Sequence, residues 1–197
     1  MQIYKIDGMI PVISPKAFVH ESAVIIGDVF IDEGVYIGPL CSIRGDFGRI
    51  IIQKNANIQD CCVIHSFPHL DVVVEENGHI GHSVILHGCV VKYNAMVGMG
   101  SVVMDEAVVG ENAIIGAASL IPSKTIIPDN HLAFGNPIKV RRELRNEEID
   151  WKTKGTKAYT DLAYNCIDNL ERCDPLPQTD EERDAIRCQM HFKTKYE

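Results

Sequence analysis

Three of the eight histidines stand in a pattern that suggests a metal site. His65 ends an apolar run, and His82 and His87 lie five residues apart in the segment GHSVILHG. A neutral imidazole is a common ligand of zinc, and three protein ligands with one position open to water are typical of catalytic zinc. A single histidine is more often a solvated surface residue. The interpretation of the three as metal ligands therefore depends on where the fold places them.

A six-residue period runs through most of the chain and fixes those positions. β-Branched apolar residues recur at every sixth position from Ile13 to Ile43, from Ile52 to Ile64 and from Ile85 to Ile127, with 66–78 outside the repeat. An α-helix repeats every 3.6 residues and a strand every two, so a period of six fits neither. It predicts a triangular β-solenoid in which about 18 residues form one coil of three short faces. A sandwich of short strands is the rival interpretation, but it does not hold one phase over so many repeats.

This frame divides the three histidines between two subunits. His82 and His87 fall on different faces of one coil, so they do not easily meet on one metal ion. His65 and His87 are 22 residues apart, which is one coil plus a short insertion, so they stack on the same face. We therefore expect His65 and His87 of one subunit to share a metal with His82 of a neighbour. Triangular prisms packed side by side about a threefold axis, as in a homotrimer, would allow such sharing.

Two further motifs flank the histidines. The run RGD contains Arg44 and Asp46, and the run NIQD contains Gln59 and Asp60. Taken with GHSVILHG, the motifs resemble the γ-class carbonic anhydrase family over about residues 10 to 170. The resemblance implies a left-handed parallel β-helix whose metal is bound by His65, His82 and His87.

The resemblance also implies roles for the flanking residues. Arg44 and Asp60 would form a salt bridge across the subunit interface, and Gln59 and Asp46 would form hydrogen bonds near the metal-bound water. A forked guanidinium paired with a carboxylate fixes the register of an interface. An amide can orient a water molecule without changing the charge, and Gln59 could also hold a developing oxyanion. Tyr159, in the C-terminal segment, is expected to close over the site.

The ends of the chain are similar to one branch of this family. The segments IYKIDGMIPVI and WKTKGTKAY, with RGDFGRI and GHIGHSVILHGC, resemble the phenylacetic acid degradation protein PaaY and the carnitine operon protein CaiE. This resemblance implies a thioesterase that acts on acyl-coenzyme A in phenylacetate degradation. Zn²⁺ is the expected metal, although three histidines also suit Fe²⁺ or Co²⁺.

One departure from the family bears on the reaction. Fast carbonic anhydrases of this class carry an acidic loop whose glutamate shuttles protons, and no such insertion lies near Gln59. Thioester hydrolysis is therefore favoured over rapid hydration of CO2 to bicarbonate. The loop SFPHLDVVVEENGH offers four other candidate proton shuttles, His69, Asp71, Glu75 and Glu76. The simpler interpretation is that they are solvated charges of a surface loop. An acyltransferase that uses one histidine, and a non-catalytic scaffold, are the remaining alternatives.

The sequence divides into three parts. Residues 1–138 form the β-helix, 139–173 a C-terminal helix packing on the solenoid, and 174–197 a charged, loosely attached tail. A helical stripe is expected to face the solenoid: Tyr159, Leu162, Cys166 and Leu170. Asn146 is the expected N-cap, with acidic residues in the first turn, and Gly155 is expected to break or kink the helix.

Composition restricts the class of protein. The formal net charge of −8 argues against binding to nucleic acid or to an anionic membrane. No apolar stretch approaches the length of a membrane span, and the N-terminus lacks the pattern of a signal peptide. The seven cysteines include no C-x-x-C pair, so we expect reduced thiols in a cytoplasmic protein, with Cys41 and Cys89 in the core.

Overall fold

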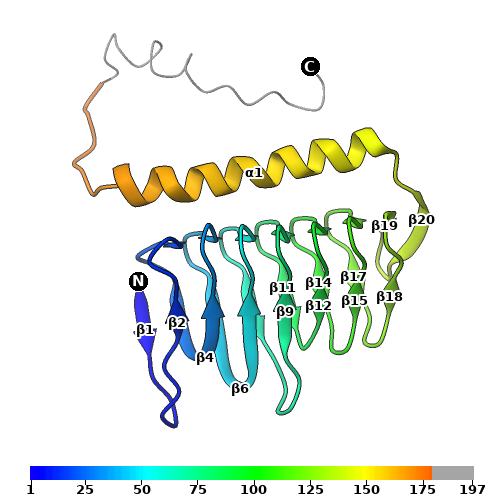
Figure 1. Ribbon diagram of the computed structural model, residues 1–197, viewed down its shortest axis with the longest axis horizontal. Coiled ribbons are helices and arrows are strands. Elements are labelled where there is room, and N and C mark those ends of the chain that lie inside the picture. Colours follow the sequence, from blue (N-terminus) through cyan, green and yellow to red (C-terminus); the bar gives the residue numbers. More distant parts are fainter. Residues whose placement is uncertain (179–197) are drawn as a thin grey trace.

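The computed structural model describes residues 1–178 and consists of a parallel β-solenoid with one long helix lying along it (Figure 1). Short strands stack coil upon coil into three faces, each strand pairing in parallel with the equivalent strand of the next coil. The hexapeptide solenoid predicted from the period of six is confirmed. The coils place every third hexapeptide on the same face, so residues about 18 positions apart lie side by side.

Two of the faces join into one continuous sheet because β4 (Val24–Ile31) and β6 (Ser42–Ile52) bend around the corner between them. The first face contains the beginning of both strands, together with β1 (Gln2–Tyr4), β8 (Val63–His65), β11 (Ile85–His87), β14 (Val102–Val103) and β17 (Leu120–Ile121). The second face contains their ends, together with β2 (Val12–Ile13), β9 (Val72–Val74), β12 (Val90–Val91), β15 (Val108–Val109) and β18 (Ile126–Ile127).

The third face forms a separate sheet. It contains β3 (Phe18–Val19), β5 (Tyr36–Ile37), β7 (Asn57–Ile58), β10 (His79–Ile80), β13 (Met96–Val97), β16 (Ile114–Ile115), β19 (His131–Phe134) and β20 (Lys139–Glu143). The last pair, β19 and β20, is antiparallel and ends the solenoid.

The core is a column of branched side chains along the axis of the prism. Each coil contributes one fully buried residue per face, as Ile43, Ile64, Leu86 and Val103 do on the first face. Burying one such side chain stabilises the fold by about 1.5–3 kcal/mol. The predicted core cysteines Cys41 and Cys89 are buried, and the cysteines within 1–178 form no disulfide.

Two details of the predicted period are wrong, and both lie next to the histidines. Leu86 is the inward residue of its coil, whereas Ile85 is 41% exposed. The corner after Leu86 is one residue short, so counting back in sixes from Val91 gives the wrong residue. In the stretch expected to lie outside the repeat, Val72 and Val74 are fully buried core residues. The insertion is therefore shorter than expected and spans only the turn after His65.

Asparagine holds the corner between the second and third faces. This corner has a positive φ in successive coils, and its residues are Asn55, Asn77, Asn94, Asn112 and Asn130. Asparagine tolerates this left-handed conformation better than most residues with a side chain. The side chains also bond along the stack, from Asn94 to Asn112 at 2.8 Å and from Asn112 to Asn130 at 2.9 Å.

Helix α1 (Asn146–Asn169) lies along the third face, as predicted (Figure 1). The predicted stripe is half correct: Tyr159 and Cys166 pack on the face, but Leu162 is 38% exposed and Leu170 is 57% exposed. The face that packs most closely instead contains Lys152, Thr156 and Ala163, all buried. The sequence prediction missed this face because it includes Lys152. Lysine is rarely buried, so a stripe that contains it is not expected to pack against the solenoid.

The start of α1 also differs from the prediction. The N-cap is Arg145 rather than Asn146, and the Glu148 side chain accepts a hydrogen bond from the Arg145 backbone N–H at 3.0 Å. Glu147 and Glu148 do lie in the first turn. The expected break at Gly155 is wrong, because the helix continues through it without interruption.

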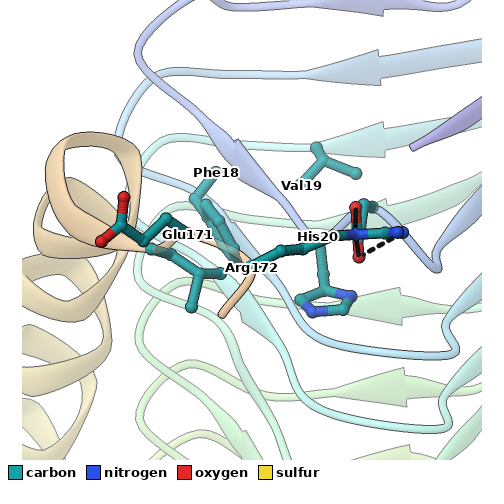
Figure 2. A pocket seen from close by; sticks show the side chains of 7 residues that line it. Phe18, Val19, His20, Glu171 and Arg172 are labelled. Atoms are coloured by element: carbon teal, nitrogen blue, oxygen red, sulfur yellow. Dashed lines mark hydrogen bonds and ion pairs between the residues drawn. The ribbon is translucent and has the colours of Figure 1, made fainter. Parts of the chain in front are cut away.

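Beyond α1 the chain turns back to the first coil. Figure 2 shows the hollow of about 250 Å³ formed there between Phe18, His20 and residues 170–172. Its rim carries an ion pair between Arg172 and Glu21, at 2.9 Å. The hollow lies at the first coil, away from the coils of the three histidines. The predicted tail 174–197 lies largely outside the described residues. Within 1–178 no helix has the length and apolar character needed to cross a membrane.

Candidate metal centre

His65 and His87 meet on the first face, one coil above the other. β8 and β11 place them directly opposite each other in register, as the 22-residue spacing predicted. His65 Nδ1 lies 3.3 Å from His87 Nε2, and the ring centroids are 5.3 Å apart. The two imidazoles therefore direct one nitrogen each towards a common point.

A carboxylate lies behind each imidazole. Asp46 Oδ1 is 2.9 Å from His65 Nε2, and Asp105 Oδ1 is 2.7 Å from His87 Nδ1. A carboxylate only accepts hydrogen bonds, so each ring carries its proton on the outer nitrogen. Burial opposes ionisation of Asp46, but the hydrogen bond from His65 and the charge of Arg44 hold its pKa below the usual value.

This arrangement suits a metal ion. With both protons on the outer nitrogens, His65 Nδ1 and His87 Nε2 face each other as lone pairs, which a cation between them would stabilise. Zinc bonded to two nitrogens at tetrahedral angles separates them by about 3.3 Å, which matches the observed distance. A carboxylate or carbonyl behind the ring is also the usual support of a metal-bound histidine. The donor set therefore fits zinc as two of its ligands.

His82 lies at the opposite edge of the first face. It occupies the turn before β11, and its side chain is 41% exposed. His82 and His87 are five positions apart along the chain, a span of up to roughly 16 Å if the chain is extended. Within residues 1–178 no three His, Cys, Asp or Glu side chains come together closely enough to hold a metal ion. The chain thus brings two of the predicted ligands together and places the third apart from them, partly exposed.

Asp60 pairs with His82 in the same way as the other two carboxylates pair with their histidines. Its Oδ2 lies 2.5 Å from His82 Nδ1. All three predicted ligands thus have one ring nitrogen bonded to an aspartate, and the second nitrogens of His65 and His87 face each other. The predicted partner of Asp60, Arg44, instead pairs with Asp46 inside the subunit at 2.7 Å. Arg44 remains 44% exposed, and the structure gives it a contact only through Nη1.

Gln59 is buried beside His82, and its amide is held by two neighbours. Its Nε2 lies 3.0 Å from Asn57 Oδ1 and 2.9 Å from His79 Nε2. His79 Nδ1 in turn lies 3.2 Å from Thr156 Oγ1 on α1. Burial, and then the charges of Lys152 and His82, lower the pKa of His79 to about 3, so its ring is neutral. Because both N–H groups of Gln59 have partners, its oxygen is the atom left to accept a hydrogen bond.

Tyr159 connects the helix to this part of the site. Its ring packs edge-on against His79 and Tyr36, with centroids 5.4 Å from each. Burial raises its pKa, with a further contribution from Asp60. Tyr159 lines a hollow of about 310 Å³ that also borders Gln59 and His82. The structure thus brings Tyr159, Gln59 and His82 together, and places His65, His87 and Asp46 in a second group.

Several residues of these groups were missed from the sequence. Asp105 lies 18 residues after His87, so the coil period could have identified it. Phe47 and Phe67 flank the histidine pair, with Phe67 edge-on to His87 at 5.0 Å and Phe47 5.5 Å from His65. His79 was missed as well, although it lies 22 residues after Asn57 and pairs with it in register on the third face, so the coil spacing could have placed it beside Gln59.

The acidic residues of the loop after His65 mostly support the backbone. Asp71 accepts a hydrogen bond from the Arg49 N–H at 3.3 Å, and Glu75 accepts one from the Tyr93 N–H at 2.7 Å. These contacts are structural and do not point towards the histidines. They give no support to a proton shuttle at either residue.

Comparison with known proteins identifies relatives that span the chain. The carnitine operon protein CaiE of Salmonella newport (strain SL254) is 47% identical over 195 residues, which are 99% of this chain and 98% of CaiE. CaiE of Salmonella heidelberg (strain SL476) matches to the same extent. No family model matches the chain.

Two crystal structures share the fold at substantial sequence identity. A proposed acetyltransferase of Bacillus cereus has a TM-score of 0.84 and 38% identity, over 85% of this chain and 97% of that one. A hexapeptide transferase family protein of Anaplasma phagocytophilum has a TM-score of 0.79 and 37% identity, over 82% of this chain and 96% of that one.

Proposed function

The chain belongs to the CaiE/PaaY branch of the γ-carbonic-anhydrase-like hexapeptide-repeat family, and on that premise we propose that it is a metal-dependent thioesterase acting on acyl-coenzyme A. The metal is held by His65 and His87 of one subunit and His82 of a neighbour in a homotrimer. The substrates are those of the PaaY type, thioesters that arise in phenylacetate degradation. Zn²⁺ is the proposed metal, with Fe²⁺ or Co²⁺ as alternatives.

One observation carries this proposal: two imidazole nitrogens face each other at 3.3 Å, and each ring is fixed from behind by an aspartate. An ordinary surface histidine needs neither the convergence nor the carboxylate. The third histidine has the same aspartate support but lies at the opposite edge of the face. If a metal ion is shared between subunits, all three histidines serve as its ligands in the same way.

The bound metal would supply Lewis-acid activation of water at neutral pH. The protein supplies position and charge. Asp46, Asp60 and Asp105 keep the three imidazoles in the required tautomer and orientation. Gln59 offers its side-chain oxygen as a hydrogen-bond acceptor, which suits orienting a water molecule better than donating to an oxyanion. Tyr159 contributes a neutral ring and hydroxyl beside the same hollow.

The overall reaction is hydrolysis of the thioester. The oxygen of water forms a bond to the carbonyl carbon, the carbon–sulfur bond breaks, and the sulfur takes up one proton of the water and leaves as coenzyme A thiol. The second product is a carboxylate, and one proton is released. The proposed interface also contains the pair between Arg44 and Asp60 of neighbouring subunits, since the Arg44 side chain remains partly exposed.

Two other activities use parts of this site. CO2 hydration needs the same metal but must remove a proton at each turnover, and the structure gives no support to a shuttle at Asp71 or Glu75. Acyl transfer is favoured by the likeness to the Bacillus cereus structure. An acyltransferase needs an acceptor to release coenzyme A, whereas a thioesterase needs only water.

The test is steady-state kinetics on protein of measured metal content, with a panel of acyl-coenzyme A thioesters and with CO2. We expect release of coenzyme A without an added acceptor, loss of that activity on chelation, and recovery with Zn²⁺. His87→Ala should abolish it. His131→Ala is the matched control, because the His131 ring bonds to the backbone carbonyl of Asp129 and takes no part in the site. Turnover that persists after verified loss of metal would contradict the proposal.

A further inference from the structure

A continuous hollow runs from the Gln59–His82 side of the site to the flank of α1. Its first part, of about 310 Å³, borders Gln59 and His82 and extends under Trp151. Its second part, of about 490 Å³, lies along α1 beside Gly155. His79, Met96, Trp151 and Tyr159 line both parts, so the two adjoin. Each volume lies in the range of small-molecule sites.

The second part of the hollow is apolar. Its walls come from Met96 on β13 and from Trp151, Ala158 and Leu162 on α1. Two of its polar lining residues, Lys152 and His79, are already bonded within the protein. Lys152 Nζ donates to Asn77 O and Asn94 Oδ1, both at 2.8 Å, and the nitrogens of His79 contact Gln59 and Thr156. A ligand group in this part therefore meets mostly carbon and sulfur atoms, with Tyr159 as the polar residue at the side shared with the first part.

We propose that this hollow binds the acyl group of the thioester, and that it selects medium-sized apolar acyl groups. The carbonyl lies at the Gln59 and His82 end, and the acyl chain or ring extends past Met96 and Trp151 to the space beside Gly155. The inference rests on the proposed function and names the part of the substrate that this site recognises. Met96 is suited to this role because its flexible thioether adapts to differently shaped groups.

Gly155 explains why the space stays open. A Cβ built on Gly155 meets no atom within 4 Å, and the helix is regular there. A side chain at this position would project into the hollow without a clash. Replacing a helical glycine also raises helix propensity, so such variants are expected to fold.

The experiment compares Gly155→Leu, which fills the hollow, with Gly155→Ala as the matched control. The ligands are the non-hydrolysable thioethers S-ethyl- and S-hexyl-coenzyme A, with affinity measured by calorimetry, followed by turnover of acetyl-, hexanoyl- and phenylacetyl-coenzyme A. The unaltered protein should bind the hexyl compound at least about tenfold more tightly than the ethyl compound. Gly155→Leu should remove that preference and lower kcat/KM for the two larger thioesters, leaving acetyl-coenzyme A nearly unchanged. Gly155→Ala should keep the preference.

The outcomes separate the two proposals. A chain-length preference that Gly155→Leu removes, without turnover of any thioester, supports the acyl site and refutes the thioesterase. A preference that Gly155→Leu leaves intact, or equal binding of both thioethers by the unaltered protein, overturns the acyl site whatever the turnover.

Discussion

Asp105 provides the sharpest test of the metal site, because nothing in the family motifs marks it. Its Oδ1 lies 2.7 Å from His87 Nδ1, and its side chain is 17% exposed. Asp105→Asn keeps the shape but removes the charge, and an amide can donate to His87 Nδ1 as well as accept from it. If the amide donates, the ring proton moves to Nε2, the nitrogen that faces His65.

Loss of a carboxylate behind a metal-binding histidine typically lowers metal affinity 10–100-fold, which is about 1.4–2.8 kcal/mol. We expect Asp105→Asn to weaken zinc binding within this range, measured by competition with a chromophoric chelator. Glu106→Gln is the matched control, since Glu106 is the next residue and its carboxylate pairs with Lys124, at 3.6 Å, rather than with a histidine. Equal zinc affinities for the folded Asp105→Asn and unaltered proteins would refute the assignment of His87 as a ligand.

Two further predictions concern assembly and stability. Mixed trimers of inactive His65→Ala and inactive His82→Ala subunits should regain part of the activity, because some interfaces then contain all three ligands; confirmed mixed trimers with no recovery would argue against a shared site. Burial lowers the pKa of Lys152 from its usual 10.5 to about 7, so between these pH values the unfolded chain binds more protons and stability should rise with pH, by at most about 1.4 kcal/mol per pH unit. Lys152→Met should flatten that rise in urea unfolding at fixed protein concentration, and an unchanged slope would show that Lys152 stays charged in the folded protein.

The fold could be predicted because one physical requirement repeats in every coil. The narrow prism accepts one branched side chain per face, and that demand is visible as a period of six in the sequence. The phase failed only where a corner changes length, at Ile85 and in the stretch containing Val72. The branched core residues do not record the length of a corner. The asparagine corner does record the changed coil length, because Asn55 and Asn77 are 22 residues apart and Asn77 and Asn94 are 17 apart.

The site could be predicted only as far as the coil period reaches. It placed His65 over His87, and applied once more it would have placed Asp105 beside His87. The coil period could not predict the contacts that α1 makes with the solenoid. Lys152 is buried because the Asn77 carbonyl and the Asn94 side chain offer two acceptors, and two acceptors match the two N–H groups of a neutral amine. Thr156 reaches His79 through the same packing.

The geometry of the solenoid makes sharing between subunits a necessity for a three-histidine site of this kind. Strands of successive coils lie about 4.8 Å apart, so tilted rings at equivalent positions can bring their nitrogens to the separation that a tetrahedral metal requires. Residues at opposite edges of one face are held apart by the extended chain and cannot close that distance without breaking the coil. Two ligands are therefore available from stacked positions, and a third at the far edge can serve only another subunit. His65 and His87 against His82 have this distribution, each with its own aspartate, which is the arrangement that the proposed metal site between subunits requires.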